Sequence, residues 1–261
     1  RPPRSTLFPY TTLFRSDISF VGSMYNEKGN FYDRIYDKLA PWARGYLDAI
    51  IAAQQNVYGM NFLEDMLSGT PDTNRILGEL MRVEPYTPNA DGIESPAYTY
   101  ANYFLARKVA QNERTALLSA VSEHFTTKLY THNKTPDMPH VINQGAIDFY
   151  DNMPYVFKCS KINLNITLRS IKNGIPLRCM DIMGAGGFLM TNFQADFLNH
   201  FTPDVDYVYF ESKDDLINKC DYYLKHDDER WAIAENGHKK VQQFHNYRTR
   251  LEEIFEVCGL L

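Results

Sequence analysis

The segment KINLNITLRSIKNGIPLRCMDIMGAGGFLMT (161–191) changes its hydrophobic pattern twice, and the type of fold follows from these changes. KINLNIT (161–167) is predicted to be a strand, and GGFLMT (186–191) is a short apolar run typical of a strand buried in a sheet. PLRCMDIMGA (176–185) lies between them and opens with a proline, which suits the first turn of a helix. A strand, a helix and a second strand in this order predict a parallel sheet with the helix on one face.

The sequence on either side continues this alternation. Further strands are predicted at 17–23, 128–132, 140–145 and 206–212. Helices are predicted at 46–67, 101–125, 146–160, from 212 onward, at 227–245 and at 247–258. The helix at 146–160 is expected to break near Pro154. In the last helix one apolar stripe is formed by Leu251, Ile254, Phe255 and Cys258. We therefore expect an α/β fold, a Rossmann-like parallel sheet with helices on both faces, plus a helical insertion at about 36–110. Ligands of such sheets bind at the carboxyl ends of the strands.

The first sixteen residues, RPPRSTLFPYTTLFRS, differ in texture from the rest of the chain. They contain three arginines and no acid, but Pro9 and Arg15 interrupt the apolar run that a secretory signal requires. Residue for residue they resemble the in-frame translation of an adapter used in short-read DNA sequencing. We therefore interpret residues 1–16 as an assembly artefact, leave them out of the expected fold, and expect the natural gene to extend further upstream.

The composition excludes several classes of partner. Without the three arginines of residues 1–16, 24 basic residues face 32 acidic ones, which argues against nonspecific binding to nucleic acid or to anionic membranes. With 44% hydrophobic residues and no apolar run near the length of a membrane span, the chain is predicted to be globular, without a transmembrane segment. The four cysteines are far apart and fit neither a zinc site nor a small disulfide scaffold, so we expect a cytoplasmic location.

Two charged residues at the start of the helix predicted at 176–185 are candidates for a binding site. A helix N-terminus favours a phosphate group, and Arg178 in the first turn adds a planar charge that can bind it in a bidentate manner. Asp181, one turn further, can accept hydrogen bonds from two neighbouring ribose hydroxyls. In the alternative interpretation, Asp181 only complements the helix dipole and Arg178 is its neighbour on the surface.

Other motifs carry less chemistry. GAGG (184–187) lacks the Lys-Ser/Thr of a phosphate-binding loop, and Gly186 and Gly187 are predicted to end the helix and to admit close backbone approach. DVD (204–206) resembles a metal-binding Asp-x-Asp, although two acids before a strand are more often a solvated turn. The histidines form no metal-binding pair, those of the two closing helices are expected to be solvated, and no G-x-S-x-G motif supports a hydrolase.

Three segments together resemble the donor-binding half of GT-B glycosyltransferases. ISFVGSMYNEKG is similar to the opening strand and loop of that half, usually written V-G-R-x-x-x-x-K-G. HVINQGAIDFYDNMPYVFKCSKINLNIT resembles the elements before the donor loop, and GIPLRCMDIMGAGGFLMTNF resembles the segment that holds a nucleotide sugar. The resemblance covers about 17–35 and 110–256 and is greatest to the family 1-like group that includes spore-maturation glycosyltransferase domains. It implies that 17–261 is a nucleotide-sugar-binding domain, and that an acceptor-binding domain precedes it.

The resemblance also implies a set of donor-binding residues. Lys28 corresponds to the phosphate-binding lysine, Asp181 takes the place of the glutamate that holds the ribose, and Gly174 lies in the loop that faces the sugar and the diphosphate. The expected site is completed by Ser23, Asn165, Asn173 and Arg178. Two positions depart from the family pattern: Ser23 stands where an arginine is usual, a loss that Arg178 can offset, and Asn173 replaces the first acid of the E-x7-E pair.

The implied reaction moves a hexose from a nucleoside diphosphate to an acceptor hydroxyl of unknown type. No metal or other cofactor is expected, because glycosyltransferases of this type generally need none. An alternative from a different class is a degenerate module that binds a sugar nucleotide without transferring it, and the departures at Ser23 and Asn173 motivate it. A nucleotide-sugar epimerase of similar shape is a further alternative.

Overall fold

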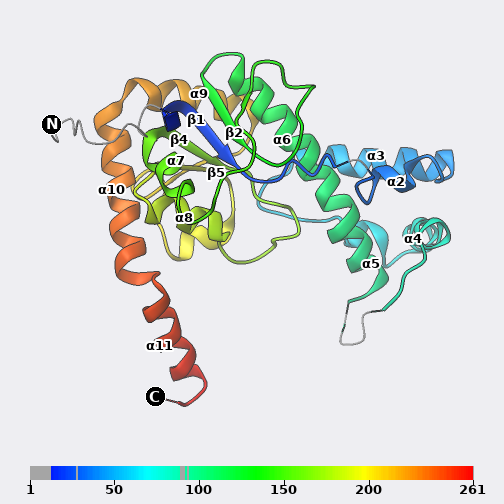
Figure 1. Cartoon of the computed structure of the whole chain (residues 1–261). Coiled ribbons are helices and arrows are strands. Elements are labelled where there is room, and N and C mark those ends of the chain that lie inside the picture. Colours follow the sequence, from blue (N-terminus) through cyan, green and yellow to red (C-terminus); the bar gives the residue numbers. More distant parts are fainter. Residues whose placement is uncertain (1–12, 28, 89–91, 93, 261) are drawn as a thin grey trace.

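The computed structural model describes residues 13–27, 29–88, 92 and 94–260 (Figure 1). The described residues form the strands β1 (Ser16–Val21), β2 (Thr127–Tyr130), β3 (Ile142–Asn143), β4 (Ser160–Asn165), β5 (Leu189–Asn192) and β6 (Val208–Phe210). The α-helices are α2 (Asp33–Tyr36), α3 (Pro41–Gln55), α4 (Pro71–Val83), α5 (Pro96–Thr99), α6 (Ala106–Ser122), α7 (Met153–Cys159), α8 (Leu177–Gly184), α9 (Lys213–Lys225), α10 (Asp227–Phe244) and α11 (Tyr247–Val257). Two 3-10 segments, η1 (Asp65–Leu67) and η3 (Ala195–Asn199), and a π-helical segment, η2 (Tyr100–Leu105), complete them.

The strands form one parallel sheet in the order β3-β2-β1-β4-β5-β6. Ile18 of β1 is opposite Thr127 of β2 on one side and opposite Ile162 of β4 on the other. The chain therefore builds the sheet outward from β1 in one direction and then, from β4, in the other. The loops that leave β1 and β4 diverge at this point, which is where parallel sheets of this order bind ligands. The predicted Rossmann-like α/β fold is confirmed.

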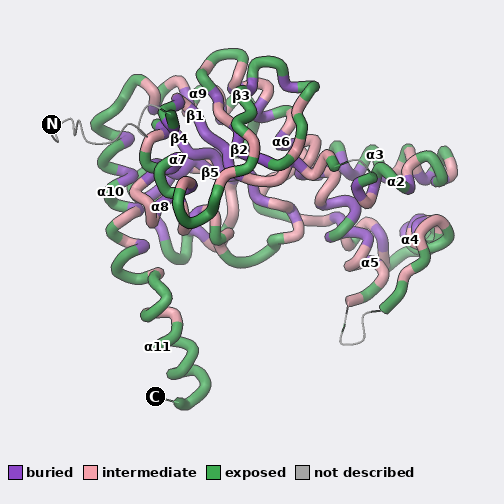
Figure 2. The backbone as a smooth tube through the Cα atoms, viewed as in Figure 1, coloured by how far each residue is buried: buried purple, intermediate pink, exposed green. Residues whose placement is uncertain are grey.

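Helices cover both faces of the sheet, and each face has its own apolar core (Figure 2). On one face α6 and α9 pack on side chains such as Ile18, Leu164 and Met190. On the other face α7 and α8 pack on Leu189 and Tyr130, and α10 contributes to both cores. Burial on both faces also encloses polar residues of the strands, and the Ser19 hydroxyl of β1 donates a hydrogen bond to the Asn163 amide oxygen of β4 at 2.7 Å.

Residues between β1 and α6 form a group of helices beside the sheet (Figure 1). Their apolar residues make a third core, which is separate from the two cores of the sheet and includes Leu47, Leu67, Leu80 and Phe104. α6 joins the two parts, since its Val109 belongs to the third core and its Leu117 to a core of the sheet. A residue of α6 between these two positions therefore lies where the helical group meets the strand ends.

Several boundaries differ from those predicted. β1 begins at Ser16, one residue before the expected limit at Asp17, because Ser16 pairs with Ser160 of β4 and their hydroxyls are 3.0 Å apart. Pro154 lies in the first turn of α7 rather than breaking a longer helix, and Pro176 is the N-cap of α8 rather than its first residue. Proline fits both positions because the N–H groups of a first helical turn have no intrahelical partner.

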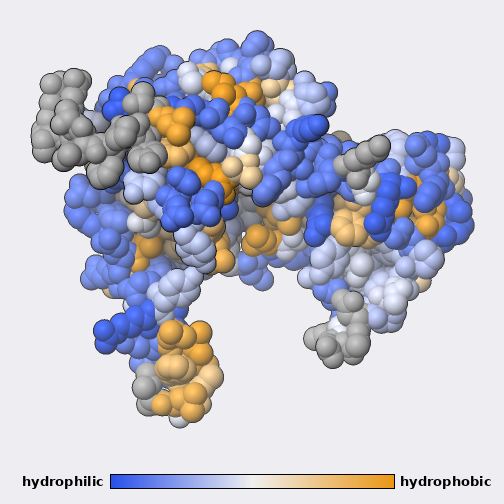
Figure 3. Space-filling model, viewed as in Figure 1, coloured by the Kyte–Doolittle hydropathy of each residue, from blue (hydrophilic) through white to orange (hydrophobic). Residues whose placement is uncertain are grey.

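The apolar stripe of the last helix is not buried in the structure. The predicted stripe of Leu251, Ile254, Phe255 and Cys258 exists on α11, but none of its residues is buried. Figure 3 shows these apolar side chains gathered at the end of the molecule where α11 extends away from the sheet. Helical periodicity identified the helix correctly, but it does not determine whether an apolar face meets a partner. Within the described part of the chain, no helix has both the length and the apolar character needed to cross a bilayer.

Candidate functional site

A hollow of about 280 Å³ opens at the carboxyl ends of β1, β2 and β3, and we call it the β1–β3 hollow. The loops that follow the three strands form most of its wall, and α7 and α8 close it on one side. Its lining consists of Val21, Gly22, Ser23, Glu27, Tyr130, Thr131, His132, Asn133, Ala146, Ile147, Phe149, Met153 and Arg178. The hollow therefore lies beside the point where the strand order reverses.

The loop after β1 is held by the loop after β2. The Asn133 amide oxygen accepts hydrogen bonds from the Met24 N–H at 2.8 Å and the Ser23 hydroxyl at 3.3 Å, while its NH₂ group donates to Glu27 at 3.0 Å. The Ser23 hydroxyl also donates to the Glu27 carboxylate at 3.1 Å. Ser23 thus lines the hollow. Asn133 and its neighbours Thr131 and His132 were not among the predicted site residues, although polar residues at the end of a predicted strand are a signal that would have found them.

The first turn of α8 separates the β1–β3 hollow from a second one. Arg178 lines the β1–β3 hollow, contacts the Met153 sulfur and lies 5.7 Å from the centre of the Phe157 ring. Asp181 forms an ion pair with Arg178 at 3.6 Å and lines the second hollow. Burial raises the pKa of Asp181, which Arg178 opposes, and burial lowers the pKa of Arg178. The structure therefore brings together two of the predicted site residues.

The second hollow, which we call the α8–α10 hollow, has a volume of about 610 Å³. It lies between the start of α8, η3 and the junction of α10 with α11. Gly174 is part of its wall, with a φ of 84° and an N–H that donates to the Asp196 carboxylate. His245, expected to be solvated, instead stacks on Phe201 at 4.8 Å, and burial lowers its pKa to about 4. Its environment is therefore that of a partly buried, neutral imidazole.

Two glycines allow the backbone to pack closely around α8. Gly186, with a φ of 75°, follows the end of the helix as predicted. A Cβ on Gly187 would lie 2.7 Å from the Phe157 carbonyl oxygen, so only glycine fits between α7 and β5. The predicted role of these glycines, to end the helix and admit close backbone approach, is confirmed.

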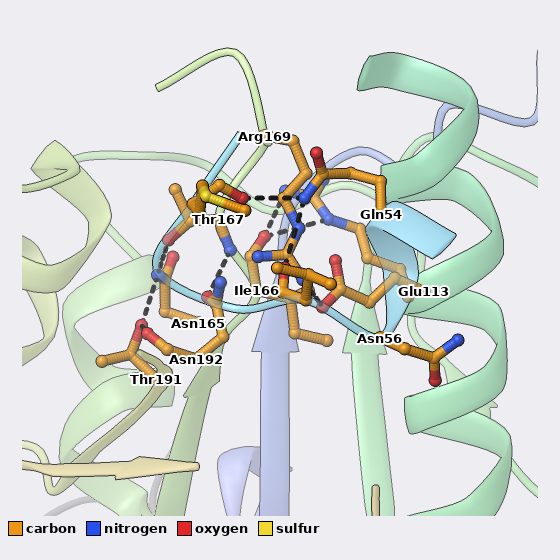
Figure 4. A network of polar contacts seen from close by, with 12 residues as sticks. Gln54, Asn56, Glu113, Asn165, Ile166, Thr167, Arg169, Thr191 and Asn192 are labelled. Carbon is orange, nitrogen blue, oxygen red and sulfur yellow. Dashed lines mark hydrogen bonds and ion pairs between the residues drawn. The ribbon is translucent and has the colours of Figure 1, made fainter. Parts of the chain in front are cut away.

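A layer of buried polar side chains lies beneath the strand ends (Figure 4). Arg169, in the loop after β4, forms an ion pair with Glu113 of α6 at 2.8 Å, and both side chains are almost fully buried. Burial raises the pKa of Glu113, and Arg169 opposes this. The Arg169 guanidinium also lies 4.5 Å from the centre of the Tyr58 ring, which the helical group supplies. This pair therefore ties the loop after β4 to both α6 and the helical group.

Asn165 belongs to this buried layer rather than to a hollow. Its amide donates to the hydroxyls of Thr167 at 2.8 Å and Thr191 at 2.9 Å, and Asn192 accepts a hydrogen bond from the Thr167 N–H at 2.8 Å. Asn165 is buried and is not part of the walls of the two hollows. Its amide is engaged by the neighbouring strand and loop, and its assignment to the donor site stays a prediction.

The side chain of Arg114, on α6, lies between the loops that follow β1 and β4. One guanidinium nitrogen, Nη1, donates to the Ser23 carbonyl at 2.6 Å, and Nη2 and Nε donate to the Ile166 carbonyl at 2.6 and 3.2 Å. The guanidinium lies 5.2 Å from the centre of the Phe20 ring and 4.9 Å from that of Tyr25. No pattern in the sequence indicated this residue, since it lies within the helix that runs from the helical group to the sheet.

The remaining predicted residues do not meet in one place. Lys28 lies outside the described residues. Asn173 is exposed in the loop before α8 and is not part of the walls of the two hollows. In the DVD motif, Asp206 is buried, accepts a hydrogen bond from the Thr202 N–H and pairs with Lys240 at 2.6 Å. Among the described residues, no cluster of three or more histidine, cysteine or acidic side chains is arranged to hold a metal ion.

Comparison with known proteins identifies a family for this chain. The model of a family described as glycosyl transferase-like matches residues 105–256, which span β2 to β6 and end in α11. The Anabaena protein Alr3699/HepE, crystallised with UDP, has a TM-score of 0.45 and 11% identity over 94% of this chain and 100% of its own. Its structure with UDP and glucose has a TM-score of 0.44 and 11% identity over 95% of this chain and 100% of its own. No curated protein matches the chain.

Proposed function

This chain belongs to the glycosyl transferase-like family, and we propose that it binds a nucleotide-diphosphosugar at the β1–β3 hollow and transfers the hexose to an acceptor hydroxyl. The observation that carries the proposal is the pair of Arg178, in the first turn of α8, with Asp181, one turn further, at the carboxyl ends of the parallel strands. A guanidinium that lines a hollow beside a helix N-terminus is suited to an anionic group. A carboxylate one turn away is suited to the hydroxyls of a ribose.

The proposed roles follow from these positions. The diphosphate lies against Arg178 and the loop that contains Gly22 and Ser23, and the ribose passes the first turn of α8 so that its hydroxyls reach Asp181 in the adjoining α8–α10 hollow. Binding replaces part of the Arg178–Asp181 interaction by interactions with the ligand, and the weak pairing at 3.6 Å makes this exchange favourable.

In the transfer step, the bond between the sugar carbon and the diphosphate oxygen breaks while the acceptor oxygen bonds to that carbon. The bonding pair remains on the diphosphate, whose negative charge increases. The fixed charge of Arg178 and the N–H dipoles at the start of α8 stabilise this charge without rearranging, which lowers the barrier. The acceptor hydroxyl loses its proton to a base that is not part of this proposal.

Calorimetric titration with UDP and with GDP tests the donor site. We expect saturable binding of one of the two, and a loss of about tenfold or more in affinity in Asp181→Asn and in Arg178→Met, equal to about 1.4 kcal/mol. Asp221→Asn is the matched control, because Asp221 forms an exposed ion pair with Lys225 at 2.7 Å on α9, and it should bind like the parent. A folded parent that binds neither nucleotide would refute the proposal.

A binding module without transfer is the second candidate. The hydrogen bonds of the Ser23 side chain to Glu27 and Asn133 favour it, since this side chain brings no positive charge to the hollow. The two candidates differ in their product. Release of UDP or GDP from a nucleotide sugar in the presence of an acceptor, abolished in Asp181→Asn, favours transfer, whereas binding without release favours the module.

A further inference from the structure

We propose that Arg114 is a positioning residue that supplies, from beneath the β1–β3 hollow, a fixed positive charge for the diphosphate of the bound nucleotide. The inference rests on the proposed function, and it assigns to that site a charge that comes from α6 rather than from the loops that line it. Arg114 is buried and is not part of the wall of the hollow, so it does not touch the ligand. It acts by holding the backbone of the loop after β1 and by the electric field of its guanidinium.

The first argument is position. Gly22 and Ser23 line the hollow directly after β1, and the Arg114 Nη1 donates to the Ser23 carbonyl at 2.6 Å. A Cβ built on Gly22 would lie 3.9 Å from the same Nη1. The guanidinium therefore lies immediately behind the backbone that forms this part of the wall. Since it also holds the Ile166 carbonyl, it fixes the separation of the loops after β1 and β4.

The second argument is charge. The Arg114 guanidinium donates three hydrogen bonds to the neutral carbonyl groups of Ser23 and Ile166, and among the described residues no carboxylate forms an ion pair with it. Burial lowers the pKa of Arg114, whereas the neighbouring Tyr25 and Glu113 favour its charged form. The guanidinium is thus a positive charge in a poorly hydrated place directly behind the wall of the hollow. An anion that binds in the hollow lies near this charge and is attracted by it.

The third argument separates Arg114 from its neighbour on the helix. Glu113 is neutralised by Arg169 at 2.8 Å, and both groups are buried away from the β1–β3 hollow. Arg114 has no such partner in the described part of the chain. A buried cation without a counter-ion is costly, and it is retained at functional sites where a ligand provides the opposite charge.

The test compares the affinities for UDP and for uridine in the full chain. In Arg114→Met, we expect the affinity for UDP to fall at least tenfold while that for uridine changes less than twofold, because uridine lacks the diphosphate. Arg114→Lys keeps the charge but cannot hold both carbonyls, and it should retain most of the preference for UDP. Placing the charge on the rim instead, with Ser23→Arg added to Arg114→Met, should restore the preference.

Each outcome decides the inference. If Arg114→Met weakens UDP and uridine equally, or if neither Arg114→Lys nor the double variant retains the preference, Arg114 is only a structural support and the proposal is wrong. If Arg114→Met does not fold, Arg114→Lys decides alone, because a structural role predicts equal losses for the two ligands. A parent that binds the nucleoside and its diphosphate with equal affinity overturns this inference, with guanosine and GDP replacing uridine and UDP if GDP is the nucleotide that binds. A parent that binds neither UDP nor GDP overturns the proposed function as well.

Discussion

The buried polar layer beneath the strand ends and the rim of the β1–β3 hollow contain the same kinds of side chain in different surroundings. In the buried layer, Glu113 and Arg169 pair at 2.8 Å with almost no exposure to water. At the rim, Arg178 and Asp181 pair at 3.6 Å, and more than a quarter of each side chain is exposed. The charged groups of the first pair contact each other and almost no water. Those of the second pair remain partly hydrated, so a ligand can replace one partner of the pair.

This difference indicates which pair serves stability and which serves binding. Removing one partner of a buried pair leaves a charge that neither water nor protein satisfies, so the cost is large. Removing one partner of a hydrated pair costs little, because water replaces it. Arg114 lies between these extremes, since it is buried like the first pair but bonded to neutral groups in the immediate vicinity of the rim.

The largest effect is expected from breaking the buried pair. Glu113→Ala leaves Arg169 buried and unpaired, and we expect a loss of about 3–5 kcal/mol in the free energy of unfolding, measured by urea denaturation. Glu113→Gln, which keeps a hydrogen-bond acceptor beside the guanidinium, should lose less. If the alanine variant loses under about 1 kcal/mol, the two regions do not differ as the structure indicates.

A smaller effect is expected at the rim. Glu27 is the acidic side chain in the wall of the β1–β3 hollow, and its carboxylate repels a diphosphate. Glu27→Gln should therefore strengthen UDP binding by about threefold in low salt, with a smaller gain at high ionic strength. Calorimetry at two salt concentrations measures this effect. Unchanged affinity at both concentrations would place the diphosphate away from Glu27.

A further effect concerns the α8–α10 hollow and the dependence of stability on pH. The pKa of His245 is about 4 in the folded chain and ordinarily 6.5, so between these values the unfolded state binds the proton that the folded state does not. The contribution of His245 therefore lowers the stability as the pH falls from 6.5 to 4. His245→Phe, which keeps an aromatic ring beside Phe201, should make the stability less dependent on pH in this range.

The control for this measurement is His140→Phe, since His140 is exposed. Urea denaturation at several pH values between 4 and 7 gives the three stability profiles. The profile of His140→Phe should run parallel to that of the parent. A parallel profile for His245→Phe would show that the packing around this imidazole does not lower its pKa.

Much of the fold followed from the sequence, whereas the site followed only in part. KINLNIT was identified as a strand and GGFLMT as a buried strand, and β4 and β5 lie within three residues of these limits. Arg178 and Asp181 were identified together because they are three residues apart on one helix, which places them on the same side. Asn165 was predicted to bind the donor, and in the structure its amide donates to Thr167 and to Thr191 of the neighbouring strand.

The alternation of strand and helix patterns was enough to predict the parallel sheet, since a helix between two strands of such a sheet crosses over one of its faces. The resemblance of the second half to glycosyltransferases was likewise present in the residues themselves. The position of Arg114 was not, because it depends on two carbonyl groups that are 91 and 52 residues away in the chain. Backbone carbonyls carry no signature in an amino-acid sequence, so only the packing of α6 across the ends of β1 and β4 decides what such a side chain meets.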